Sequence, residues 1–218
     1  MLKVGYNKTM SPLRLHTSHS RARIHAEAFS LIELLITTAI LIILYTMLFG
    51  FSARQNQIRQ KTKCRSNLQK MYVSLQIYAN DSRGLFPAAT NAQTSEDVLA
   101  VLVPRYSADN SIYICPGGKD SKLTPGESLR NARISYAYYM GRSETNNGDV
   151  LMSDRQVSTA AKVVGELVFS DNGKKPGNNH HKYGGSFLHC DGSMNSSASI
   201  LAIPLPLVTN VVLLNPKP

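Results

Sequence analysis

The hydrophobic pattern of the chain begins with one long apolar run. Residues 34–51 contain no charged side chain, and only three threonines interrupt them as distinctly polar residues. At 1.5 Å per residue such a helix measures about 27 Å, close to the roughly 30 Å hydrocarbon thickness of a bilayer. The run has no polar face, unlike the core helix of a soluble protein. The pattern predicts a membrane-spanning helix over residues 29–51, which contains one acid, Glu33.

The helical pattern continues after residue 51 but becomes amphipathic. No Gly or Pro occurs between Phe51 and Asp81, and Gly84 and Pro87 then supply a stop. We predict one helix over residues 29–80, whose part 52–80 packs one face on a globular head. That face consists of apolar residues at 4-3-4-3 spacing, namely Cys64, Leu68, Met71, Leu75 and Tyr78.

The rest of the chain, residues 81–218, shows the short apolar patterns of a small β-rich domain. A short helix begins at Ser95 as its cap and ends at Pro104. Residues 184–197 form a predicted hairpin with Asp191-Gly192 as a two-residue turn. The fold class predicted is α+β, with the long helix packed on an antiparallel-sheet head. Further strands are expected at residues 111–115, 134–140, 149–152 and 166–170, with a closing strand within the tail 200–214.

The segment before the apolar run is basic and ends in a small residue. Residues 1–28 contain five Lys and Arg and a single acid, Glu27. A secretory signal places its small-residue cleavage site after a 7–15-residue apolar core. In this chain the small residue, Ala28, precedes the run. Cleavage after Ala28 would remove the leader and keep the span.

Residues 28–34 read Ala-Phe-Ser-Leu-Ile-Glu-Leu. Between a basic leader and an apolar run, this segment resembles the processing motif of type IV prepilins and type II secretion pseudopilins. The resemblance implies a pilin-like fold and removal of leader 1–28 by a prepilin peptidase, between Ala28 and Phe29. It also implies N-methylation of the Phe29 amine. The family usually has Gly where this chain has Ala28.

The resemblance also implies a role for Glu33. An acid inside a membrane span costs about 2.5–3.5 kcal/mol on insertion scales and is functional by default. In such filaments the glutamate faces the free amine of a neighbouring subunit, and a buried acid is tolerated when a positive partner compensates it. We expect Glu33 to set the register of assembly. The alternative is that Glu33 only sits among lipid headgroups.

The processing motif and the flanking charges predict opposite orientations of the span. The motif implies a single-pass protein of the bacterial inner membrane, with the leader cytoplasmic and the head periplasmic, or carried into an extracellular fibre. The positive-inside rule favours the reverse, because three Lys and Arg flank the leader side of the span and six flank the other side. We give precedence to the motif, since its peptidase acts on a cytoplasmic leader.

A second resemblance lies in the head. His181 is followed after nine residues by Asp191-Gly192, the His-x9-Asp-Gly segment of a bacterial group of prepilin-like proteins. The resemblance assigns no chemistry to this segment, and we expect His181 to brace its loop. The group also shows Cys-x-x-Asn-Leu, Tyr-Ala-Asn-Asp and Ile-Cys-Pro segments, which begin here at Cys64, Tyr78 and Ile114.

Candidate chemistry elsewhere is sparse. Three cysteines leave at least one unpaired, and Cys115 with Cys190 is the better pair because Cys64 lies on the helix stripe. No nucleophile elbow, phosphate loop or metalloprotease helix occurs, so we expect no enzyme activity. The candidate ligands lack the short paired spacings of zinc sites, so we expect no metal and no cofactor. These candidates are His180, His181, His189, Cys190 and Asp191.

Charge leaves more than one function open. The chain has 24 Lys and Arg against 14 Asp and Glu, a formal net charge of +10. The favoured function is a structural subunit of a pseudopilus or pilus-like fibre. Its partners would be a prepilin peptidase, other pilin subunits, inner-membrane assembly machinery and lipid. One alternative is a DNA-binding pilin for DNA uptake, although the basic run 54–70 favours a solvated face over nucleic acid. The other is a membrane-anchored ligand-binding protein.

Overall fold

The computed structural model describes residues 30–118, 120–179 and 183–218. One compact unit ends at Tyr45, and the second comprises Thr46–Pro218. The architecture is α+β, as predicted: a long helix, α1 (Leu31–Asp81, 51 residues), and a five-stranded antiparallel sheet. The predicted leader, the cleavage site at Ala28 and Phe29, and His181 lie outside the described residues.

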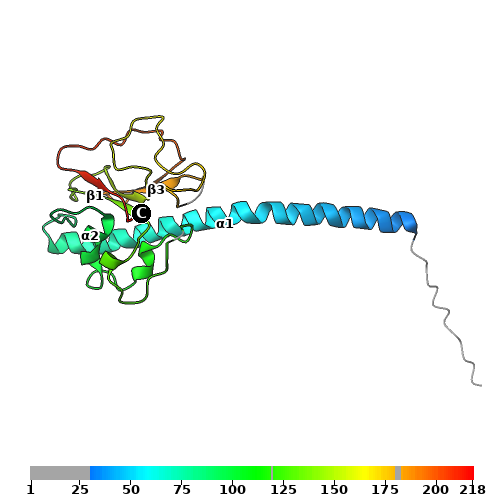
Figure 1. Cartoon of the computed structure of the whole chain (residues 1–218), viewed down its shortest axis with the longest axis horizontal. Coiled ribbons are helices and arrows are strands. Elements are labelled where there is room, and N and C mark those ends of the chain that lie inside the picture. The colour runs from blue at the N-terminus through cyan, green and yellow to red at the C-terminus, as the bar shows by residue number, and fades with distance from the viewer. Residues whose placement is uncertain (1–29, 119, 180–182) are drawn as a thin grey trace, which may run out of the picture. The chain divides into compact units, whose positions relative to one another are not determined.

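The second half of α1 packs on the head through the predicted apolar stripe. Cys64, Leu68, Met71 and Leu75 are completely buried, and Ala79 completes the stripe one turn later. Tyr78 is only partly buried and touches the edge of this core. The cyan part of α1 in Figure 1 lies against the sheet and the loops around it. Residues 46–81 of α1 therefore belong to the same unit as the head.

The sheet contains β1 (Tyr136–Met140), β2 (Val150–Asp154), β3 (Gly185–His189), β4 (Met194–Ser197) and β5 (Val212–Leu214). Their order across the sheet is β4-β3-β2-β1-β5. Antiparallel pairing joins every neighbour, with Tyr138 of β1 opposite both Met152 of β2 and Leu214 of β5. A register irregularity lies between Val150 and Met152, where β2 meets β3.

Alternation along β1 places side chains on two separate cores. Tyr136 and Tyr138 pack into the core that contains the α1 stripe. Ala137 and Tyr139, between and beside them, pack into a second core on the other face with Phe169 and the C-terminal tail. A period of two is the geometry of a strand. Because both faces are covered, β1 reads in sequence as a nearly continuous apolar run.

The predicted strands at 134–140 and 149–152 correspond to β1 and β2, and the hairpin 184–197 corresponds to β3 and β4. The prediction at 111–115 was wrong: residues Asn110–Tyr113 form a 3₁₀ turn, η2. The Asp109 carboxylate accepts the Ser111 N–H at 2.9 Å and caps this turn. Such local capping competes with strand pairing. Two further 3₁₀ turns are η1 (Ala100–Leu102) and η3 (Leu129–Asn131).

Two other expectations needed correction. The predicted strand 166–170 makes only an isolated bridge, between Leu167 and Ile200, because it pairs with an irregular tail rather than a strand. The short helix α2 (Ser95–Leu99) has Thr94, not Ser95, as its N-cap. The Ser95 hydroxyl instead donates to the Leu214 carbonyl oxygen at 2.7 Å, which ties α2 to β5.

Candidate functional site

The first half of α1 is long and apolar enough to cross a membrane. The segment Leu31–Leu48 comprises 18 residues, and none of it is buried by the rest of the protein. Its aliphatic side chains have more than half of their surface exposed, up to 82% at Leu31. Burial of so much apolar surface requires lipid or other protein. This segment, which we call the apolar segment, is one part of the candidate site.

Glu33 lies in the first turn of α1. Within the described residues its carboxylate has no hydrogen-bond or ion-pair partner. The neighbouring hydroxyls differ, because Thr37 and Thr38 each donate to the carbonyl three residues earlier at 3.0 Å. Glu33 is exposed and is the one charged side chain of the apolar segment Leu31–Leu48.

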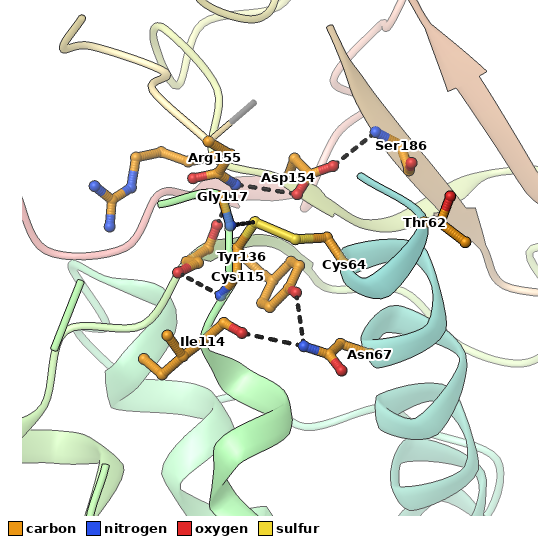
Figure 2. The surroundings of a disulfide bond; sticks show 12 residues. Thr62, Cys64, Asn67, Ile114, Cys115, Gly117, Tyr136, Asp154, Arg155 and Ser186 are labelled. Carbon is orange, nitrogen blue, oxygen red and sulfur yellow. Dashed lines mark hydrogen bonds between the residues drawn. A yellow bond between two sulfur atoms is a disulfide. The ribbon is translucent and has the colours of Figure 1, made fainter. Parts of the chain in front are cut away.

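A disulfide joins α1 to the head, between Cys64 and Cys115 (Figure 2). The expected Cys115–Cys190 pair was wrong. The buried stripe of α1 brings the Cα of Cys64 within 5.2 Å of that of Cys115, a separation usual for a disulfide. Cys190 is instead a free, buried cysteine after β3. Burial raises the pKa of its thiol to about 12, so the thiol stays protonated and unreactive.

The disulfide lies where the Cys-x-x-Asn-Leu segment of α1 meets the Ile-Cys-Pro segment of the head. The Asn67 side-chain amide donates to the Ile114 carbonyl at 3.1 Å, one residue before Cys115. The same amide reaches the Tyr136 hydroxyl on β1 at 3.3 Å (Figure 2). Cys-x-x-Asn-Leu and Ile-Cys-Pro thus form one structural unit that clamps α1 to the head.

Asp154 lies beside the disulfide at the end of β2 and is completely buried. Its carboxylate accepts the Ser186 N–H at 2.8 Å and the Asn179 side-chain amide at 3.1 Å. One of its carboxylate oxygens and the sulfurs of Cys64 and Cys115 lie within 4.8 Å of one another. Metal binding by cysteine needs thiolates, which a disulfide does not provide. The cluster of Cys64, Cys115 and Asp154 therefore has a structural role in the described residues.

A buried ion pair extends the same region. The Arg155 guanidinium donates to the Asp120 carboxylate at 3.1 Å, and both side chains are 8% exposed. The Ser135 hydroxyl donates to that carboxylate at 2.7 Å and accepts the Cys115 N–H at 2.9 Å. The pair is thereby hydrogen-bonded to the disulfide loop. Removing one partner of such a pair typically costs about 3–5 kcal/mol, so it fixes this loop.

Asp191 and Gly192 lie in the β3–β4 connection, as predicted, but the turn is longer than two residues. The His189 N–H donates to the Ser193 carbonyl at 2.9 Å, and the Gly192 N–H donates to the His189 carbonyl at 3.0 Å. Gly192 has a φ of +81°, the left-handed conformation that closes three-residue hairpin loops. The connection packs on α1, since the Tyr72 hydroxyl donates to the Cys190 carbonyl at 3.1 Å.

No family model, curated protein or solved structure matches the chain. The candidate site therefore rests on its residues and their geometry.

We expect Gly192→Ala to lower the free energy of unfolding by more than Gly126→Ala. Both glycines have positive φ, +81° and +82°. A methyl group on Gly192 would lie 2.6 Å from the Tyr72 ring, whereas one on Gly126 meets nothing within 4 Å. The backbone cost alone is about 1 kcal/mol, so the excess at Gly192 measures its contact with α1. Urea unfolding of the full chain in detergent gives both values, and equal losses would contradict this packing.

Sequence inspection missed three of the residues that organise this region: Asp154, Asp120 and Arg155. Each is a common residue type without a motif, and charged residues are buried only when paired. Their partners are separated by 32 residues for Asp154 and Ser186, and by 35 for Arg155 and Asp120. The hydrophobic pattern of a short sequence window does not show which residues pair over such separations.

Proposed function

We propose that this chain is a structural subunit of a type II secretion-like pseudopilus or type IV pilus-like fibre. A prepilin peptidase would remove residues 1–28, and the apolar segment would hold the subunit in the bacterial inner membrane before assembly. The head would face the periplasm. Its partners would be other pilin or pseudopilin subunits and the inner-membrane machinery that assembles them. The chain would be the substrate of a peptidase and not itself an enzyme.

One observation carries this proposal: a single helix, α1, combines the exposed apolar segment with a buried stripe on the head. A simple membrane anchor needs neither an acid in its apolar part nor an amphipathic continuation fixed by a disulfide. Glu33 supplies the first, and Cys64 supplies the second. The acid has no partner within the described residues, which supports a partner on another subunit.

The alternatives have weaker support. DNA uptake would be favoured by a stripe of Lys and Arg on the head that is absent from the helix. The described basic cavity beside α1 instead takes Lys63 and Lys70 from the helix and Lys122 from the head. A ligand-binding protein would be favoured by an apolar pocket in the head. The cavity beside α1 combines its lysines with apolar residues, and the more apolar cavity around Tyr139, Val150 and Leu205 measures only about 140 Å³, below the roughly 300–1,000 Å³ of ligand pockets. Fibre assembly therefore remains our proposal.

Processing is the first test. We expect the mature protein extracted from membranes to begin at Phe29 with a methylated amine, because the small residue Ala28 precedes the apolar segment. N-terminal sequencing and mass spectrometry of the same band provide the measurement. A variant with a large residue before the cut, Ala28→Leu, should retain the leader and run as a larger species.

Two results would overturn the proposal. A mature chain that keeps Met1 would show that no leader is removed. A chain that starts after Phe51 would show that the apolar segment is itself a cleaved signal.

A further inference from the structure

Two adjoining cavities form a basic groove along one flank of α1. They measure about 740 and 610 Å³ and share Lys63 and Pro116 in their walls. The single acid described in these walls, Asp120, is already paired with Arg155 at 3.1 Å. We define the basic groove by its four exposed cations, Arg59, Lys63, Lys70 and Lys122.

The groove is concentrated on one face of the helix. Lys63, Ser66, Asn67 and Lys70 follow i, i+3, i+4, i+7 spacing and all line the larger cavity. Residues with that spacing share a helix face. None of the four cations forms an ion pair within the part of the chain that the structure describes. The groove is therefore an uncompensated positive surface, and it favours a negatively charged occupant.

Carboxylates occupy the other flank of the same helix. Tyr72 lies across the buried stripe from the groove, and the turn at Gly192 packs so closely on its ring that a methyl group there would be 2.6 Å away. The adjacent Asp191 is exposed. Glu144 lies beside the end of α1, with one carboxylate oxygen 3.4 Å from the position of a methyl group on Gly84. We define Asp191 and Glu144 as the acidic flank.

The two carboxylates act on the same tyrosine. Burial raises the pKa of Tyr72, and the negative charges of Asp191 and Glu144 raise it further against a hydrogen bond from Gln76. Neither carboxylate forms an ion pair among the described residues. The groove flank of α1 is thus positive, whereas two carboxylates of the head lie beside the later part of the opposite flank. Earlier on that opposite flank, Lys61 and Arg65 donate to the carbonyl oxygens of Tyr183 and Met194 at 2.8 and 3.3 Å.

We propose that the basic groove of one copy binds the acidic flank of the next copy, with the two helices side by side in the same direction. This contact rests on the proposed fibre. Two grooves facing each other would repel, which disfavours a two-fold dimer. A contact between different surfaces is heterologous, and when its rotation does not close, it produces an open helical filament. The acidic flank lies farther along α1 than the groove, so neighbours would be staggered by on the order of 10–20 Å.

Charge reversal tests the contact. Lys63→Glu with Lys70→Glu should reduce the fibre recovered by shearing at least fivefold, because like charges would then meet at each contact. Adding Glu144→Lys and Asp191→Lys to that chain should restore recovery. The matched control is Lys174→Glu with Lys175→Glu, the same charge change at two exposed lysines outside the groove. It should leave recovery unchanged.

Cross-linking provides a second readout that does not depend on yield. One subunit carries Ser66→Cys in the groove, and a second subunit carries Thr145→Cys beside Glu144. When the two subunits are co-expressed, they should form a disulfide-linked dimer. Ser66→Cys alone should not, since a heterologous contact does not bring two grooves together. Background is low, because Cys64 and Cys115 are bonded to each other and Cys190 is buried.

The outcomes separate this contact from the proposed function. Wild-type recovery from the Lys63→Glu, Lys70→Glu subunits, or dimers from Ser66→Cys alone, would overturn the contact and leave the fibre standing. Loss of DNA retention by those subunits with unchanged fibre recovery would assign the groove to nucleic acid instead. If the wild-type chain is not processed at Phe29 and forms no fibre, both proposals fall.

Discussion

Subunits carrying Glu33→Gln are expected to be inserted and cleaved normally but to fail in fibre assembly. The substitution removes an acid from the apolar segment, so insertion should become easier by up to about 2.5–3.5 kcal/mol. Cleavage between Ala28 and Phe29 should continue, because glutamine keeps the size and polarity of the side chain. The substitution should therefore impair fibre assembly, which follows insertion and cleavage.

Assembly should suffer because the amine of Phe29 would lose its counter-charge. In the proposed fibre, we expect the Glu33 carboxylate in the first turn of α1 to pair with the amine of Phe29 of a neighbouring subunit. Deleting one member of a buried pair typically costs about 3–5 kcal/mol. At every subunit of a fibre, such a loss should abolish assembly. Shear-released fibre and processed subunit are measured from the same cells.

Thr37→Val is the matched control for this experiment. It also removes a polar group from the apolar segment, but that hydroxyl is satisfied by the Leu34 carbonyl of its own helix at 3.0 Å. Fibre recovery should be close to wild type. If Glu33→Gln subunits assemble equally well, Glu33 has no role in register. If they accumulate uncleaved, the acid serves the peptidase and not the fibre.

The predictable parts of the fold are those in which apolar residues follow a clear local pattern. The α1 stripe repeats every three or four residues, and β1 is a run of apolar and aromatic residues whose side chains alternate between two cores. A helix with one buried face shows a period of three to four residues, and a strand buried on both faces shows a short continuous apolar run. The segment at 111–115 has the same β-branched and aromatic composition, and its five residues equal the length of β1. There the Asp109 cap, which acts over two residues, prevailed over strand propensity.

The disulfide could not be predicted because it depends on a distance between segments. Sequence placed Cys64 correctly on the buried stripe of α1 but did not show what that stripe packs against. In the folded chain the stripe meets the segment that follows η2, and the two cysteines are 51 positions apart. The β3–β4 connection turns Cys190 toward Tyr72, where its carbonyl accepts a hydrogen bond. Excluding the helical cysteine was therefore the error.

Cys64→Ala is expected to lower the free energy of unfolding by about 4 kcal/mol, through loss of a loop closed over a separation of 51 residues. Without the cross-link the unfolded chain gains conformational freedom, while the native stripe keeps most of its contacts. The loss should appear as a lower urea midpoint for the full chain in detergent. A thiol reductant should lower the wild-type midpoint by a similar amount and leave Cys64→Ala unaffected.

Cys190→Ala distinguishes loss of the cross-link from loss of a buried sulfur. Cys190 is 1% exposed and Cys64 is completely buried, so removing the Cys190 sulfur creates a comparable small cavity without opening a disulfide. Its cost should be about 1–2 kcal/mol, well below that of Cys64→Ala. The variant should also keep the full response to reductant, because the Cys64–Cys115 bond is still present. The opposite pattern, with Cys190→Ala insensitive to reductant and Cys64→Ala sensitive, would restore the Cys115–Cys190 pair and remove the clamp between α1 and the head.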